Sequence, residues 1–165
     1  MMAAARRRKL PIACWLPLCL MKQAYQLRTK HKSKLLFAMM NALAGEDASI
    51  SFEGRLSNTC LVKIAGGRFE ETEVLRRRKL QPRLDFLVLP LTPASLSNIE
   101  KAIDPKVAFN RDAGIVHVQI EKQGQIAFAA YDQFHQDSVV AYPAVPIALL
   151  NELVAKRVLY SFEAG

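Results

Sequence analysis

The chain has little cysteine and little glycine. Its three cysteines are Cys14, Cys19 and Cys60, and none belongs to a Cys-x-x-Cys pair, so neither a disulfide framework nor a cysteine-based zinc site is expected. The 7 glycines and the lack of sustained heptads exclude collagen-like and coiled-coil arrays. A hydrophobic fraction of 51% excludes an intrinsically disordered chain. A length of 165 residues therefore predicts one globular domain, with or without a short appendage.

The sequence also lacks the short motifs that identify the commonest enzyme classes. It has no Gly-x-Gly-x-x-Gly, no Walker-type loop, no His-Glu-x-x-His, no Gly-x-Ser-x-Gly and no EF-hand loop. Zinc-finger, RNP and KH signatures of nucleic-acid binding are missing as well. These absences favour a protein that is not an enzyme and uses no cofactor, while an enzyme of a less common type stays open.

Acidic residues are missing from the beginning of the chain. Residues 1–45 hold nine Lys or Arg and no Asp or Glu; because the whole chain carries +8, the remaining 120 residues carry −1. A basic surface typically meets a polyanion, since phosphates release counterions on binding Lys and Arg. That expectation applies to the N-terminal third and not to the nearly neutral remainder.

Residues 1–20 have the outline of a targeting segment. Arg6–Lys9 precede an apolar stretch, as in a secretory signal, but Pro11 and Pro17 interrupt it. The stretch is shorter than the ~20 residues of a membrane span, and no transmembrane span is expected elsewhere. We interpret residues 1–20 as an extension and 21–165 as the domain, with secretory or organellar targeting left open. The single body cysteine, Cys60, favours a cytoplasmic location.

Hydrophobic periodicity predicts an α+β domain with a mixed or largely antiparallel sheet of four or five strands and two or three helices on one face. Residues 84–91 are apolar on both faces, which predicts a central strand. Residues 69–79 suit a helix, with a strand over 74–80 as the alternative. Other strands are expected over 21–29, 48–54 and 115–131, helices over 33–44, 92–104 and 146–160, and loops over 104–114 and 132–145.

The hairpin within residues 115–131 allows two registers. A two-residue loop, Gln123-Gly124, places Val118 opposite Ala129. A three-residue loop, residues 122–124, places Val118 opposite Phe128 and gathers the bulky apolar side chains on one face. Because burial fixes register, we expect the three-residue loop. The opposite face then carries His117, Gln119, Ala127, Ala129 and Tyr131.

The predicted core combines the apolar faces of these elements. Its strand members are Ile50, Phe52, Phe86, Val88, Val116, Val118, Ile120, Ile126 and Phe128. Its helical members are Leu36, Met39, Leu43, Ile99, Ile103, Leu150 and Val154.

Three groups of residues are candidates for function. An imidazole near carboxylates can act as a general base or bind a metal, which makes His117, Asp132, His135 and Asp137 weak candidates for a metal-assisted hydrolase; an ordinary solvated loop is the simpler interpretation. Two basic sets could bind nucleic acid: Arg28, Lys30, Lys32 and Lys34, within residues 22–34, and Arg76, Arg77, Arg78 and Lys79, within residues 76–83. An apolar group could contact another protein: Val139, Val140, Tyr142 and Val145.

Of these, we favour a small non-enzymatic module that binds another protein, as an adaptor or an inhibitor does. The expectation depends on the missing catalytic motifs and on the apolar residues 139–147. A nucleic-acid-binding module is the alternative, and the hydrolase is the third hypothesis. Fold class alone decides among none of them.

Overall fold

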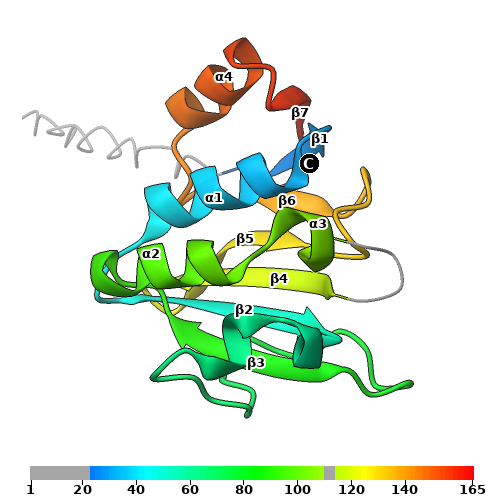
Figure 1. Cartoon of the computed structure of the whole chain (residues 1–165). Coiled ribbons are helices and arrows are strands. Elements are labelled where there is room, and N and C mark those ends of the chain that lie inside the picture. Colours follow the sequence, from blue (N-terminus) through cyan, green and yellow to red (C-terminus); the bar gives the residue numbers. More distant parts are fainter. Residues whose placement is uncertain (1–22, 110–113) are drawn as a thin grey trace, which may run out of the picture.

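The computed structural model describes residues 23–109 and 114–165, and the predicted extension, residues 1–20, lies outside them. Within the described part, seven strands form one antiparallel sheet in the order β3-β2-β4-β5-β6-β1-β7 (Figure 1). The strands are β1 Tyr25–Thr29, β2 Ala48–Gly54, β3 Asp85–Pro90, β4 Ile115–Lys122, β5 Gln125–Ala130, β6 Val139–Ala141 and β7 Leu159–Ala164.

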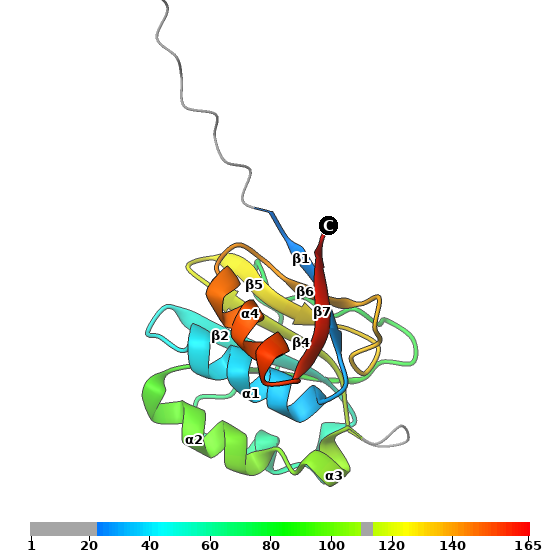
Figure 2. The same cartoon turned by 90° about the horizontal axis from the view of Figure 1, so that it is seen from above.

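The helices lie on one face of this sheet, as the two views at right angles show (Figures 1 and 2). They are α1 Lys32–Leu43, α2 Pro93–Ala102, α3 Pro105–Ala108 and α4 Ile147–Ala155. The α+β class is therefore confirmed, but the predicted four or five strands and two or three helices are too few. No helix among the described residues is long and apolar enough to span a bilayer.

The main hydrophobic core lies between the helices and the sheet. Helix α1 contributes five buried side chains because its apolar residues recur at helical spacing. Phe52 and Phe128 are fully buried against this cluster, and burying one such side chain stabilises the fold by about 1.5–3 kcal/mol. The α1 residues are Leu35, Leu36, Met39, Met40 and Leu43.

Several predicted elements are confirmed. Strand β2 covers the predicted residues 48–54, and α1 matches the predicted helix to within one residue. Helix α2 begins at Pro93, and Thr92 caps it by accepting a hydrogen bond from the backbone amide of Ser95. Local patterns were sufficient for these elements, since periodicity and a capping residue indicate the same boundaries.

Other predicted elements are wrong. The apolar strand β3 is at the edge of the sheet, not at its centre, and residues 69–79 form neither helix nor strand. Residues 105–108 form α3 within a predicted loop, and β6 lies within the loop predicted over 132–145. The last helix ends at Ala155; Arg157, with a φ of 58°, then turns the chain into β7.

The hairpin has neither predicted register. Gln123 and Gly124 both have positive φ, 54° and 73°, as in a two-residue type I′ loop. A bulge between Ile120 and Glu121 then shifts the pairing, so that Val118 is opposite Ala130 and not Phe128. The bulge turns Ala127 into the main core, although it was predicted on the opposite face.

Most of the predicted core is buried, with three exceptions among the predicted residues. Val116, Ile126 and Val154 are only partly buried. Phe86 and Val88 are buried, but on the face of the sheet away from the helices, where they pack with Leu75. Residue Ile126 packs against this second, smaller cluster. The sheet therefore has apolar contacts on both faces.

The second face is covered in part by residues 55–84, here called the wrapping segment. The segment starts on the helix side, where Leu56 and Leu61 belong to the main core. It then passes the outer edge of β3, where Arg68 and Val88 exchange two backbone hydrogen bonds of 2.7 and 2.9 Å. Leu75 finally packs on the second face, so the segment turns around the edge strand.

Gly67 permits this turn. A Cβ added at Gly67 would lie 2.9 Å from Cδ1 of Leu87, and the preceding Gly66 has a φ of 84°. A side chain at either position would strain the backbone or push into β3. The Gly66-Gly67 pair therefore lets the wrapping segment come close to the edge strand.

Candidate binding surface

The most unusual local structure is the basic run, residues 76–79, of the wrapping segment. Each of its four successive backbone amides donates a hydrogen bond to a side-chain oxygen. Gln119 accepts from Arg76 at 3.5 Å, Glu71 accepts from Arg77 at 2.6 Å, and the two carboxylate oxygens of Glu53 accept from Arg78 at 2.7 Å and Lys79 at 3.0 Å. These contacts fix the backbone of the basic run over strands β2 and β4.

In this arrangement the nearby carboxylates accept hydrogen bonds from the backbone and do not pair with the cationic side chains. Glu70, Glu71 and Glu73 precede the basic run in the chain, but Glu71 accepts a hydrogen bond from a backbone amide of the run. Among the described residues, the basic run forms no ion pair with any carboxylate. Arg76, Arg78 and Lys79 are exposed. The run therefore presents positive charge to solvent from a fixed backbone.

Two guanidinium groups in the run stack on aromatic rings. Arg78 lies 4.3 Å from the ring centroid of Tyr131, and Arg77 lies 4.9 Å from that of Phe86. Arg77 also donates hydrogen bonds to the carbonyl oxygens of Leu84, at 2.7 Å, and Phe69, at 3.3 Å. Arg77 thus joins the two ends of a loop and has a structural role in the fold.

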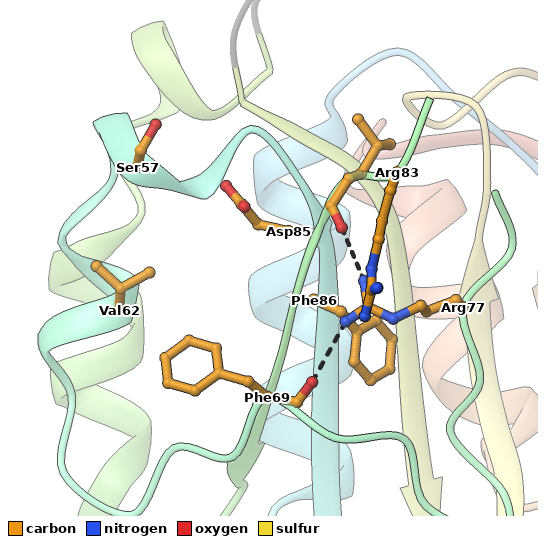
Figure 3. Close-up of a pocket in the computed structure, with 8 residues that line it drawn as sticks. Ser57, Val62, Phe69, Arg77, Arg83, Asp85 and Phe86 are labelled. Atoms are coloured by element: carbon orange, nitrogen blue, oxygen red, sulfur yellow. Dashed lines mark hydrogen bonds between the residues drawn. The ribbon is translucent and has the colours of Figure 1, made fainter. Parts of the chain in front are cut away.

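A cavity of about 580 Å³, lined in part by Arg77, lies at the outer edge of β3. Figure 3 shows Val62 and the ring of Phe69 on one side of it and Arg77 with Phe86 on the other, with Ser57 and Asp85 at one end. Phe69 is 55% exposed and Val62 is 37% exposed. Asp85 is held in place because its carboxylate accepts a hydrogen bond from the amide of Leu56 at 3.0 Å.

Charge is concentrated in the wrapping segment. Residues 55–84 contain eight Lys or Arg and three Glu, a net charge of +5, whereas residues 46–165 as a whole carry −1. The rest of that region must therefore carry −6. The body of the chain is close to neutral only as a sum, and its excess of positive charge lies in the wrapping segment, which contains the basic run and contributes Arg77 and Arg83 to the cavity lining.

A polar cluster lies beneath the basic run. Glu53 and His117 are opposite each other on β2 and β4 and are nearly fully buried. Nδ1 of His117 accepts a hydrogen bond from the amide of Asp132 at 3.1 Å, and its ring contacts that of Tyr131. Burial lowers the pKa of His117, although Glu53 and Asp132 oppose the shift, and burial also raises the pKa of Tyr131. The lowered pKa favours the neutral form of His117, in agreement with Nδ1 acting as the acceptor for the amide of Asp132.

The predicted metal candidates occupy two different environments. His117 is buried and touches the backbone of Asp132, whereas His135 is exposed, with Nδ1 located 3.9 Å from the carboxylate of Asp137. Within residues 23–109 and 114–165, no three His, Cys, Asp or Glu side chains gather in a geometry that could hold a metal ion. The geometry gives the hydrolase hypothesis no support.

The four residues predicted to contact a protein differ in their burial. Val139 and Val145 belong to the main core. Val140 and Tyr142 are partly exposed. Register places Val140 beside Ala129, on the face of the sheet that also carries His117. Only these two of the four residues can therefore contact a partner directly.

The N-terminal basic set lies in the other half of the sheet from the basic run. Arg28 is exposed on β1, which is separated from β4 by β5 and β6. Lys30 and Lys34 are exposed near the start of α1, and Lys30 lies 6.0 Å from the ring centroid of Tyr160. Lys32 begins α1. The two basic sets therefore flank different strands.

Sequence reasoning missed the residues that shape this surface. Glu53 and Gln119 read as ordinary polar residues on the outer face of a strand, and Phe69 and Val62 had no pattern around them. The one available signal was charge, because the basic run follows three Glu within a few residues.

Comparison of the chain with models of protein families, with curated proteins and with solved structures found no match.

Proposed function

We propose that this protein is a non-enzymatic binding module for another protein, and that it recognises an acidic surface through the basic run and its neighbours in the wrapping segment. The observation that carries the proposal is the set of four backbone hydrogen bonds to Gln119, Glu71 and Glu53. They hold the cations in place without neutralising them. A partner with carboxylates then meets a preorganised positive surface, which lowers the ordering cost of binding.

The composition of the wrapping segment supports a protein partner. Its cations are mainly arginine, and it exposes Val62, Phe69 and Leu80, half of the large apolar side chains that are exposed among the described residues. Arginine and aromatic residues are enriched in protein interfaces, whereas lysine is depleted there. Val140 and Tyr142 can extend the contact across the same face of the sheet.

Nucleic-acid binding is the second candidate, and the unpaired cations favour it equally. The aromatic side chains favour it less, because few of them are free to stack on bases. Single-strand binding proteins offer open aromatic faces to the bases, whereas Arg77 and Arg78 already cover one face each of Phe86 and Tyr131. Phe69 remains as an exposed ring. We therefore rank an acidic protein above a nucleic acid as the partner.

The test is capture of the partner from nuclease-treated extract of the source cells, with the full chain as bait. The variant Arg76→Glu/Lys79→Glu reverses two exposed charges and leaves the backbone amides in place. Lys101→Glu/Lys106→Glu makes the same charge change on α2 and α3 and is the matched control. We expect one protein to be captured by the wild type and the control. Its direct affinity should fall about tenfold in the basic-run variant.

Two results would contradict the proposal. Equal affinity of the captured protein for both variants would place the interface elsewhere. Loss of all capture on nuclease treatment, with an oligonucleotide affinity that falls steeply with salt, would establish the nucleic-acid alternative. In that case reversing Arg76 and Lys79 should flatten the salt dependence.

A further inference from the structure

The cavity at the edge of β3 has the size and lining of a ligand-binding site. Its volume, about 580 Å³, is within the ~300–1,000 Å³ of typical ligand sites. Val62 and Phe69 face it from two separate parts of the wrapping segment (Figure 3). Both side chains keep a large exposed fraction, 37% and 55%, so an apolar group placed between them would remove further apolar surface from water.

Two residues of the cavity wall, Arg77 and Asp85, are held by hydrogen bonds within the fold. Arg77 is held by Phe69 and Leu84 and stacks on Phe86, and Asp85 is held by the amide of Leu56. These groups have their hydrogen bonds within the fold and need not move to receive a ligand. Wall residues that are held in place favour a defined side chain over a loosely adsorbed one.

The surroundings of the cavity determine the charge of its ligand. Arg83 lines the cavity and is exposed, and the basic run follows Arg77 directly in the chain. Asp85 is the one acidic residue among the lining residues, and its carboxylate already accepts a hydrogen bond. A ligand that enters therefore passes cations without a carboxylate partner, and acidic groups next to its apolar part are favoured.

We propose that this cavity receives a large apolar side chain, phenylalanine or leucine, from an acidic peptide segment of the partner. The inference depends on the function proposed above and names the feature of the partner that the surface selects. The apolar side chain packs between Val62 and Phe69. Flanking aspartate or glutamate side chains then lie near Arg83 and the basic run.

The test uses two labelled synthetic peptides, each a short run of aspartates with one central residue that is either phenylalanine or alanine. A thymidine oligonucleotide of the same charge is the third probe. Affinities for the full chain are measured by fluorescence anisotropy at several salt concentrations. We expect the phenylalanine peptide to bind about tenfold more tightly than the alanine peptide, and the oligonucleotide to bind more weakly than the phenylalanine peptide.

Variants separate the cavity from the basic run. Phe69→Ala and, independently, Val62→Ser should abolish the preference for phenylalanine and leave the affinity for the alanine peptide unchanged. Arg76→Glu/Lys79→Glu should weaken both peptides equally. Val107→Ala, which changes an exposed apolar residue on α3, is the matched control and should change neither affinity.

Each failure has its own signature. If wild type binds both peptides equally, through the basic run, the pocket inference is wrong and the proposed function stands. A preference that persists in both Phe69→Ala and Val62→Ser also overturns the pocket. Tighter binding of the oligonucleotide than of either peptide overturns both proposals, and so does the absence of any peptide binding.

Discussion

The two faces of the sheet are covered in different ways. On one face, helices place apolar side chains at regular spacing over Phe52, Phe128 and their neighbours. On the other face, an irregular segment is fixed by hydrogen bonds from its backbone to Glu53 and Gln119, with Leu75 as its buried apolar anchor. The first cover is held mainly by the hydrophobic effect and the second mainly by buried polar groups.

This difference matters for function. Helices that cover an apolar core have little freedom in which side chains they expose, because their apolar residues must face the core and their polar residues must face outward. A segment held largely by its backbone amides can expose several of its side chains, since only some of them, such as Leu75 and Arg77, take part in holding it. The wrapping segment uses this freedom to expose arginine, phenylalanine and valine together. We expect binding to be located there for this reason.

The largest expected effect is on the helix-covered face. Phe128→Ala should lower the free energy of unfolding by about 3–5 kcal/mol, because it removes a fully buried ring from the main core. Urea denaturation followed by circular dichroism measures the change. Phe69→Ala is the matched control: Phe69 is largely exposed, and its removal should change stability by about 0.5 kcal/mol or less. Equal losses would show that the ring of Phe69 is buried in solution.

A smaller and more local effect is expected on the other face. Glu53→Gln replaces one of the two acceptor oxygens with an amide NH₂, so that either Arg78 or Lys79 loses the acceptor for its backbone N–H. We expect a loss of about 1–3 kcal/mol. Hydrogen exchange should become faster in residues 76–79 while α1 stays protected.

Glu121→Gln is the control for this variant, since Glu121 is a partly exposed residue of β4 at the sheet position opposite Ser49. It should leave the exchange of residues 76–79 unchanged. If Glu53→Gln speeds exchange in α1 as much as in the basic run, the two covers unfold as one unit and the proposed distinction between them is wrong.

The same distinction explains how much of the fold could be predicted. Elements such as β2 and α1 follow from side-chain periodicity, which the main core imposes. Strand β3 was predicted at the centre of the sheet because both of its faces are apolar. It is an edge strand, and the wrapping segment, not a neighbouring strand, covers its outer edge. Long-range packing of this kind leaves no periodic signal in the sequence.

The candidate surface was less predictable than the fold. The cations of the basic run were identified from the sequence, but their accessibility depends on Glu53, which lies more than 20 positions away in the chain. Nothing local indicates that a glutamate on β2 accepts from backbone amides. Val139 and Val145 show the converse, since an apolar cluster in a loop resembles an interface in sequence and is core in the structure.

The smallest expected effect is a pH dependence of stability from the polar cluster under the basic run. The pKa of His117 is lowered below its ordinary value of 6.5 chiefly by burial, with Glu53 and Asp132 raising it and Arg78 and Lys79 lowering it. Below pH 6.5 the unfolded chain therefore binds a proton that the folded chain does not. Stability is highest above this pH and falls as the pH is lowered through 6.5 towards the folded pKa.

His117→Gln removes the titrating group and can keep an acceptor for the amide of Asp132. The free energy of unfolding, measured by urea denaturation between pH 7.5 and 5.5, should fall less in this variant than in the wild type. His135→Gln, which changes an exposed histidine, should keep the wild-type slope. If the two variants have the same slope, His117 takes up its proton equally in the folded and unfolded chain, and the cluster beneath the basic run is open to water.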